Sequence, residues 1–174
     1  LELIDEQTSE MIKIVKNLLI LAKDCEACSQ YKQVFNLLNF INTEIKEEFK
    51  NNNISFSISK DIYVNCNKEY FKMVMENLIG NAIKYSDENS EVSVIVEEIN
   101  ESAKIYVKDF GIGIADNEKR KVFGRFYRGS NVEENGIKGY GLGLNLVESI
   151  ISRMNGSIEV KDNSPQGTIF IITI

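Results

Sequence analysis

The segment from residue 77 to residue 84 carries side chains suited to binding a charged ligand. Asn77, Asn81 and Lys84 follow one another at i, i+4 and i+7, so they share one face of any helix formed there. Asparagine is a weak helix former, so two asparagines within a strong helical pattern require a reason. Two amide oxygens and an ammonium group suit a Mg²⁺ ion with its phosphate ligands. A merely solvated helix face is the alternative for this segment taken alone.

Two glycine-rich segments could place backbone against a ligand. In DFGIGI, Asp109 can accept a hydrogen bond from an exocyclic amine, while Gly111 and Gly113 let the backbone approach a planar ring. GYGLGL, residues 139–144, runs into a predicted helix start, where free N–H groups and the positive end of the helix dipole favour an anion. Each segment alone could be only a turn. The second is not a dinucleotide fingerprint, because Leu144 stands where G-x-G-x-x-G requires glycine.

Residues 110–141 between and around these segments hold many glycines and charges and little apolar periodicity, which predicts a long functional loop that acts as a lid. Its FGRFYRG segment offers two aromatic anchors and two charges that could face phosphate. These are Phe123 and Phe126, and Arg125 and Arg128.

The elements that must position these residues form a mixed pattern of helices and strands. Asn36 can cap a helix that runs to Phe49, after which the run of three asparagines marks a boundary. Other helices are predicted over residues 67–86 and 142–154. Alternating or apolar runs predict strands over residues 29–35, 54–58, 62–66, 91–99, 103–109, 157–161 and 168–174.

Residues 1–28 predict a long helix with a heptad-like apolar stripe in two rows. The stripe is wider than a two-helix seam, which favours a helical bundle over an isolated coiled coil. A helix docked on its own domain is the alternative. One row holds Ile4, Met11, Leu18 and Cys25, and the other holds Ile14, Leu21 and Cys28.

Composition excludes several classes of protein. The 174 residues, 43% of them hydrophobic, suit one main domain. The net charge of −6 arises from interspersed charges, which argues against a nucleic-acid or anionic-membrane binder. Cys25 and Cys28 form a C-x-x-C spacing without a second ligand pair or any histidine, so reduced packing thiols are expected rather than a metal or redox site. No membrane span or signal peptide is apparent, so a cytoplasmic chain is expected.

Taken in order, ENLIGNAIKYS, DFGIGI, FGRFYRG and GYGLGL resemble the N box, first glycine box, F box and second glycine box of the catalytic domain of bacterial sensor histidine kinases. The resemblance covers residues 29–174, and residues 1–28 resemble the second helix of the dimerisation and phosphotransfer bundle. It implies an α+β fold, a two-layer α/β sandwich of the GHKL superfamily, preceded by a bundle-forming helix. The lid would span about residues 115–138.

The resemblance also implies a role for each motif residue in binding ATP and Mg²⁺. Asn81 would coordinate the metal with help from Asn77, Lys84 would meet phosphate, and Arg128 would reach the γ-phosphate; these four are the expected catalytic residues. Asp109 would bind the adenine amine. The remaining expected nucleotide-binding residues are Tyr85, Gly111, Gly113, Ile114, Phe123, Arg125, Phe126, Gly139, Tyr140, Gly141, Leu142, Gly143, Leu144 and Thr168.

The sequence contains no histidine, so the resemblance implies transfer to a histidine outside these residues. The implied partners are the acceptor-histidine helix of the same parent protein, a response regulator and a second copy bound through residues 1–28. The parent protein would be membrane-anchored. An ATP-hydrolysing clamp is one alternative, although Asn77 occupies the position of its general base and Glu76 is rotated by about 100° around the helix. A nucleotide-binding module or a serine kinase acting on a partner protein is the other.

Overall fold

A five-stranded sheet forms one layer of the computed structural model, which describes residues 2–22, 31–58, 60–134, 137 and 139–174. The strand order is β2-β4-β5-β7-β6, with β2 parallel to β4 and the other pairs antiparallel. Val92, Val94 and Val96 alternate along β4 and are all buried, so one face of the sheet forms the core. The strands are β2 Ile54–Ile58, β4 Val92–Ile99, β5 Ser102–Lys108, β6 Ser157–Asp162 and β7 Thr168–Thr173.

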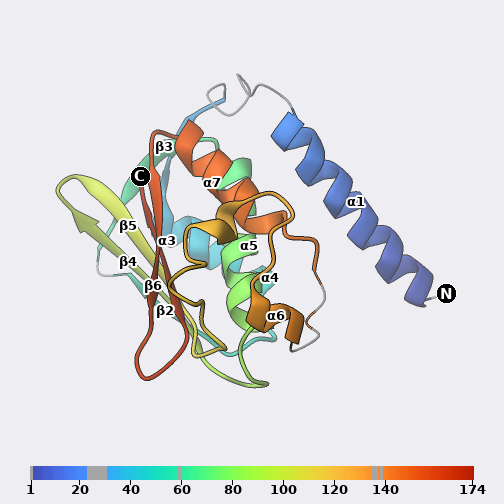
Figure 1. Ribbon diagram of the computed structural model, residues 1–174. Coiled ribbons are helices and arrows are strands. Elements are labelled where there is room, and N and C mark those ends of the chain that lie inside the picture. The colour runs from blue at the N-terminus through green and yellow to red at the C-terminus, as the bar shows by residue number, and fades with distance from the viewer. Residues whose placement is uncertain (1, 23–30, 59, 135–136, 138) are drawn as a thin grey trace.

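Two long helices, α5 (Lys68–Lys84) and α7 (Gly143–Arg153), cover that face of the sheet and pack against each other (Figure 1). Asn67 caps α5, since its side chain accepts a hydrogen bond from the Tyr70 N–H at 3.2 Å. The apolar positions of α5 fall at helical spacing and are buried: Phe71, Val74, Met75, Leu78, Ile79 and Ala82. The predicted two-layer α/β sandwich is therefore confirmed.

A second, smaller sheet and a broken helix precede α5 in the chain. Strands β1 (Gln33–Asn36) and β3 (Tyr63–Cys66) pair antiparallel. Asn36 caps the next helix as predicted, because its Oδ1 accepts from the Asn39 N–H at 2.9 Å. The predicted single helix is instead three pieces, α3 Leu37–Phe40, the π-helical η1 Ile41–Ile45 and α4 Lys46–Glu48. Strand β1 also begins later than the predicted residue 29, and residues 29–30 lie outside the described residues.

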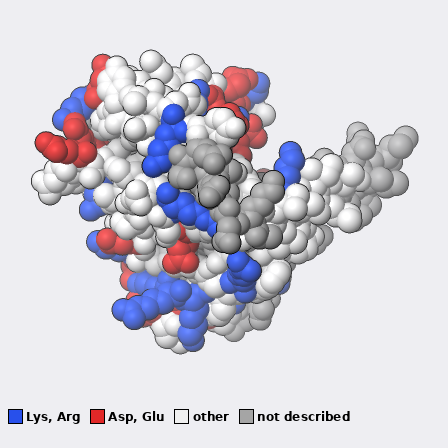
Figure 2. Space-filling view, turned by 90° about the horizontal axis from the view of Figure 1, so that it is seen from above, with Lys and Arg blue, Asp and Glu red and all other residues white. Residues whose placement is uncertain are grey.

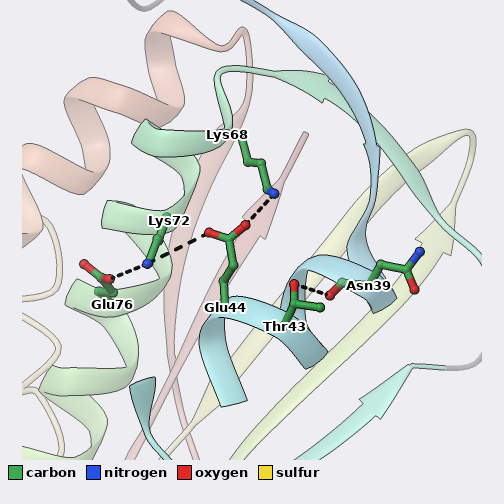
Figure 3. A network of polar contacts seen from close by, with 6 residues as sticks. All are labelled: Asn39, Thr43, Glu44, Lys68, Lys72 and Glu76. Atoms are coloured by element: carbon green, nitrogen blue, oxygen red, sulfur yellow. Dashed lines mark hydrogen bonds and ion pairs between the residues drawn. The ribbon is translucent and has the colours of Figure 1, made fainter. Parts of the chain in front are cut away.

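An ion-pair network ties η1 to α5 (Figure 3). The Glu44 carboxylate pairs with Lys68 and lies 3.9 Å from the Lys72 ammonium. Lys72 in turn lies 3.9 Å from Glu76, one turn further along α5. These residues are about one quarter exposed, so the network is only partly screened by solvent. It holds the Glu76 side chain along the η1 side of α5.

Helix α1 (Glu2–Ala22) lies on the far side of α7 from the sheet (Figure 1). Its predicted residues 23–28, including both cysteines, lie outside the described residues. Leu21 is buried and the Arg153 guanidinium donates to the Ile20 carbonyl at 3.3 Å, so one row docks on the chain's own domain. The other row stays on the surface, with Met11 66% and Leu18 40% exposed. No helix in the described ranges has the length and apolarity that a membrane crossing requires.

Candidate functional site

A cavity of about 240 Å³ opens between α5, the segment predicted to be a lid and the second glycine segment. Most of the residues singled out in the sequence line it. Those that do are Asn77, Asn81, Lys84, Tyr85, Asp109, Gly113, Ile114, Arg128, Gly139, Tyr140, Gly141, Leu142, Gly143, Leu144 and Thr168. The cavity lining does not include Gly111, Phe123, Arg125 or Phe126. Four segments that are distant in sequence therefore meet at one site.

The polar face of α5 forms one wall of the cavity. The Asn77 amide nitrogen donates to the Met73 carbonyl at 2.7 Å, which fixes the side chain and directs Oδ1 toward Gly143. A β-carbon on Gly143 would lie only 2.8 Å from that Oδ1, and one on Gly139 would lie 2.9 Å from the Lys84 ammonium nitrogen. Asn77 and Lys84 thus face the glycine segment across the cavity, which differs from a freely solvated helix face.

Asp109 lies at the end of β5, where β7 begins beside it, and is only 3% exposed. Its Oδ1 accepts two backbone N–H groups, from Gly111 at 2.9 Å and Thr168 at 3.0 Å. Burial raises the pKa of Asp109, and these two hydrogen bonds partly offset that rise. Both bonds end on Oδ1, and Oδ2 takes no hydrogen bond from the described residues. Asp109 lines the cavity, so its Oδ2 is available to an amine donor.

The first glycine of DFGIGI acts differently from our prediction. Gly111 does not face the cavity; a β-carbon there would lie 2.1 Å from the Tyr85 carbonyl oxygen. The neighbouring Ile112 N–H donates to that same carbonyl at 3.1 Å, which fastens the loop to the end of α5. Gly111 is therefore required for contact with protein backbone, whereas Gly113 lines the cavity.

The F-box segment divides between buried and exposed aromatic rings. Phe123 is 8% exposed and is an anchor as predicted, and the Asn145 amide nitrogen donates to its carbonyl at 2.8 Å. Phe126 is 65% exposed, so its prediction as an anchor is wrong. Its backbone has a φ of 61° and its N–H donates to the Gly141 carbonyl at 2.9 Å, which turns the ring outward. Arg125, adjacent to it, does not reach the cavity lining.

Arg128 is the lid cation that reaches the cavity. One of its terminal nitrogens donates to the Ile137 carbonyl at 2.5 Å, while its Nε is buried and has no hydrogen-bond partner in the described part of the chain. Its positive charge is felt across the site, since it lowers the pKa of Tyr85 against a larger rise from burial. A buried, unpaired guanidinium N–H at a cavity wall fits an anionic ligand.

The second glycine segment leads into α7. Gly141 has a φ of 66°, and a β-carbon there would lie 2.6 Å from the Phe126 carbonyl carbon. Both the backbone conformation and the lack of space therefore require glycine at this position. Helix α7 begins at Gly143 after Leu142, and no side chain caps it. Its first N–H groups are therefore open to an anion at the cavity.

Comparison with known proteins agrees with this geometry. A protein-family profile described as "Histidine kinase-, DNA gyrase B-, and HSP90-like ATPase" matches residues 66–174. The chain belongs to this ATPase family. The lining residues named above all lie within the matched range, and the buried Nε of Arg128, the close glycine contacts and the uncapped start of α7 fit a nucleoside triphosphate.

The proteins similar to this chain include sensor kinases. The chain is 39% identical over 103 residues to the sensor protein CiaH of Streptococcus pneumoniae, which covers 59% of the chain and 23% of CiaH. It is 29% identical over 180 residues to the sensor histidine kinase YvrG of Bacillus subtilis, which covers 98% of the chain and 30% of YvrG. The solved complex of histidine kinase ThkA with response regulator protein TrrA gives a TM-score of 0.75 at 25% identity, covering 99% of the chain and 49% of that kinase. The chain thus spans less than a third of these two curated relatives.

Several lining residues of this ATPase domain were not predicted. Glu118 and Tyr127 line the cavity from the lid, and Ile14 and Asn17 line it from α1. Asn17 is a buried polar residue within an apolar stripe. A polar residue at such a position is a signal in the sequence from which this lining residue could have been predicted. Glu118 lies among the charges of the DNEKRK run, and no pattern distinguishes it from its exposed neighbours. Over the face drawn in Figure 2, Lys and Arg side chains are interspersed with Asp and Glu side chains.

Proposed function

We propose that this chain is the ATP-binding catalytic core of a two-component sensor histidine kinase, which transfers the γ-phosphoryl group of Mg-ATP to a histidine outside these 174 residues. The observation that carries the proposal is the polar face of α5: Asn77 and Asn81 line the cavity opposite the phosphate-suited glycine segment. The relatives named as sensor kinases support the same reading.

Each residue would have a role in binding and orienting the nucleotide. Asn81 would bind Mg²⁺, assisted by Asn77, with Lys84 on the phosphates and Arg128 at the γ-phosphate. Asp109 would accept the adenine amine through Oδ2. Bound Mg²⁺ would neutralise phosphate charge, and the chain itself would supply position and electrostatic complementarity more than covalent chemistry.

Hydrolysis is the competing activity, and it requires a base to activate water. Asn77, one turn before Asn81, is an amide and cannot take a proton. Glu76 lies near Lys72 in the network of Figure 3 and does not line the cavity. Glu118 does line it, but the Ser130 N–H bound to its Oε1 is the largest of the causes that lower its pKa, which makes it a poor base. Slow ATP turnover is expected, which favours phosphoryl transfer over a clamp ATPase.

Partners follow from the same proposal. The acceptor would lie on the other helix of the phosphotransfer bundle in the same parent protein, and residues 1–28 would contribute its second helix. The exposed apolar row of α1, including Met11 and Leu18, supports pairing with such helices or with a second copy. A response regulator is the proposed receiver of the phosphoryl group, in line with the complex solved for ThkA. The parent would be anchored in a membrane with this part on the cytoplasmic side.

The decisive experiment mixes the chain with Mg-ATP and a separately produced acceptor helix pair. Acid-labile phosphate should appear on the acceptor, and Asn81→Ala should abolish it. Binding of ATP without any labelling would favour a nucleotide-binding module, and acid-stable phosphate on a partner's serine would favour a serine kinase. Rapid ATP turnover by the chain alone would favour the clamp ATPase.

A further inference from the structure

The buried carboxylate of Glu118 lies near the start of the lid. It contacts the segment that carries Arg128. Glu118 is 8% exposed although it belongs to a run of charged residues. Its Oε1 accepts two hydrogen bonds, from the Tyr127 hydroxyl at 2.9 Å and from the Ser130 N–H at 3.1 Å. These two donors lie on either side of Arg128 and Gly129 in the chain.

From these contacts we infer that Glu118 is a positioning residue, which holds residues 127–130 so that Arg128 faces the triphosphate end of the cavity. The inference rests on the proposed function, in which Arg128 meets the γ-phosphate. Hydrogen bonds to an ionised carboxylate are stronger and shorter than neutral ones, so two of them on one oxygen give a well-defined fastening.

The fastening point is itself rigid. The Glu118 N–H donates to the Ala115 carbonyl at 2.8 Å, and the Glu118 carbonyl accepts from Lys121 at 2.7 Å and Val122 at 3.0 Å. Lys119, the next residue, lies 2.5 Å from both Asp116 and Asp162, which joins the lid entrance to the end of β6. The carboxylate therefore projects from a turn near the start of the lid that is attached to the sheet, while its partners lie further along the lid.

Space at Gly129 supports a close approach of this carboxylate to the lid. A β-carbon on Gly129 would lie 3.2 Å from the Glu118 Oε2, so the lid backbone passes tightly over the side chain. Oε2 is buried and has no hydrogen-bond partner among the described residues. The group is thus held in place through Oε1 and packing, and shortening it would leave a gap beneath the lid.

The test separates lid positioning from general stability by comparing two nucleotides. ADP lacks the phosphate that Arg128 would address, so a misplaced Arg128 should weaken ATP binding and leave ADP binding alone. We expect Glu118→Ala to weaken ATP affinity about tenfold, the size of one charge-assisted hydrogen bond to phosphate, with ADP affinity nearly constant. Isothermal titration calorimetry of the full chain with each nucleotide in Mg²⁺ measures both constants.

Two further variants keep the inference falsifiable if Glu118→Ala folds poorly. Tyr127→Phe removes one of the two hydrogen bonds and should give a smaller loss of the same ATP-specific kind. Glu118→Gln retains an acceptor oxygen and should recover part of the loss seen with alanine. Glu148→Ala is the control, because that acid is exposed on α7 and lies outside the lid, and it should preserve the ATP to ADP affinity ratio.

The failures are distinguishable. A parallel loss of ATP and ADP affinity in the Glu118 and Tyr127 variants, or no loss of either, would overturn the positioning role while leaving the proposed function intact. Absence of any nucleotide binding by the unaltered chain would overturn the proposed function and this inference together.

Discussion

Replacement of Asp109 by asparagine should separate nucleotide affinity from stability. The change preserves shape, and the amide oxygen can still accept the N–H groups of Gly111 and Thr168 that Oδ1 binds. At Oδ2, however, an acceptor becomes an NH₂ donor, which would face the adenine amine in the proposed complex. Losing a charge-assisted hydrogen bond and opposing two donors costs about 2 to 3 kcal/mol, which is a 30- to 150-fold loss of ATP affinity at about 1.4 kcal/mol per tenfold.

The stability of Asp109→Asn should not fall with its ATP affinity. Burial raises the pKa of Asp109 in the folded chain, so the folded state binds more protons than the unfolded state between pH 3.8 and that raised pKa. The free energy of unfolding therefore falls as pH rises through this window. In Asp109→Asn this fall is absent, because an asparagine side chain does not titrate. We expect the variant to be as stable as the unaltered chain, or more stable, at neutral pH. ATP affinity of the unaltered chain should fall on acidification through the same raised pKa, because the protonated carboxyl loses its charge.

Calorimetric titration with ATP and GTP, combined with urea unfolding, tests both halves. The new amide donor suits the O6 carbonyl of guanine, so the preference for ATP over GTP should shrink in Asp109→Asn. Asp87→Asn, at an exposed position, is the control and should change neither quantity. Unchanged ATP affinity in Asp109→Asn would refute the assignment of Asp109 to the adenine amine, and a large loss of stability would refute the argument from burial.

Three other substitutions test separate parts of the site. Gly141→Ala adds a β-carbon 2.6 Å from the Phe126 backbone at a positive φ, so ATP affinity should fall at least about tenfold in calorimetry while the helices persist in circular dichroism. Asn81→Ala should abolish the Mg²⁺ dependence of ATP binding; an undiminished Mg²⁺ effect would assign the metal elsewhere. Glu76→Gln should leave ATP turnover at its low basal rate, measured by phosphate release, since Glu76 lies near Lys72 away from the cavity; a clear fall would identify it as a base.

Features with a local signal were predicted well from the sequence. Helical periodicity alone places Asn77, Asn81 and Lys84 on one face of α5, and all three line the cavity. The cap at Asn36 has the same local character. The π-helical turn of η1 was not predicted, because its apolar spacing over so few residues is indistinguishable from that of an α-helix.

Features that depend on long-range contacts were predicted poorly or only through the family resemblance. The pairing of β5 with β7 brings Thr168 to Asp109, across 59 residues of sequence, and no local pattern encodes that contact. Phe126 has the residue type of an anchor, yet its backbone turns the ring outward. Glu118 has the residue type of a surface charge, yet the lid buries it. In both cases the residue type alone predicts the wrong exposure, because tertiary contacts determine where the side chain lies.

The glycines of the site illustrate why residue type and physical role must be argued separately. Gly111 is pressed against the Tyr85 carbonyl, Gly143 faces the Asn77 amide, and only Gly141 among these three also has a positive φ. In each case the contact that excludes a β-carbon joins segments that are distant in sequence. These contacts fix the first glycine segment to α5 and the second to the F box and α5, so they set how closely these segments approach one another around the cavity. We propose that side chains such as Asp109 and Arg128, which line the same cavity, then select the ligand.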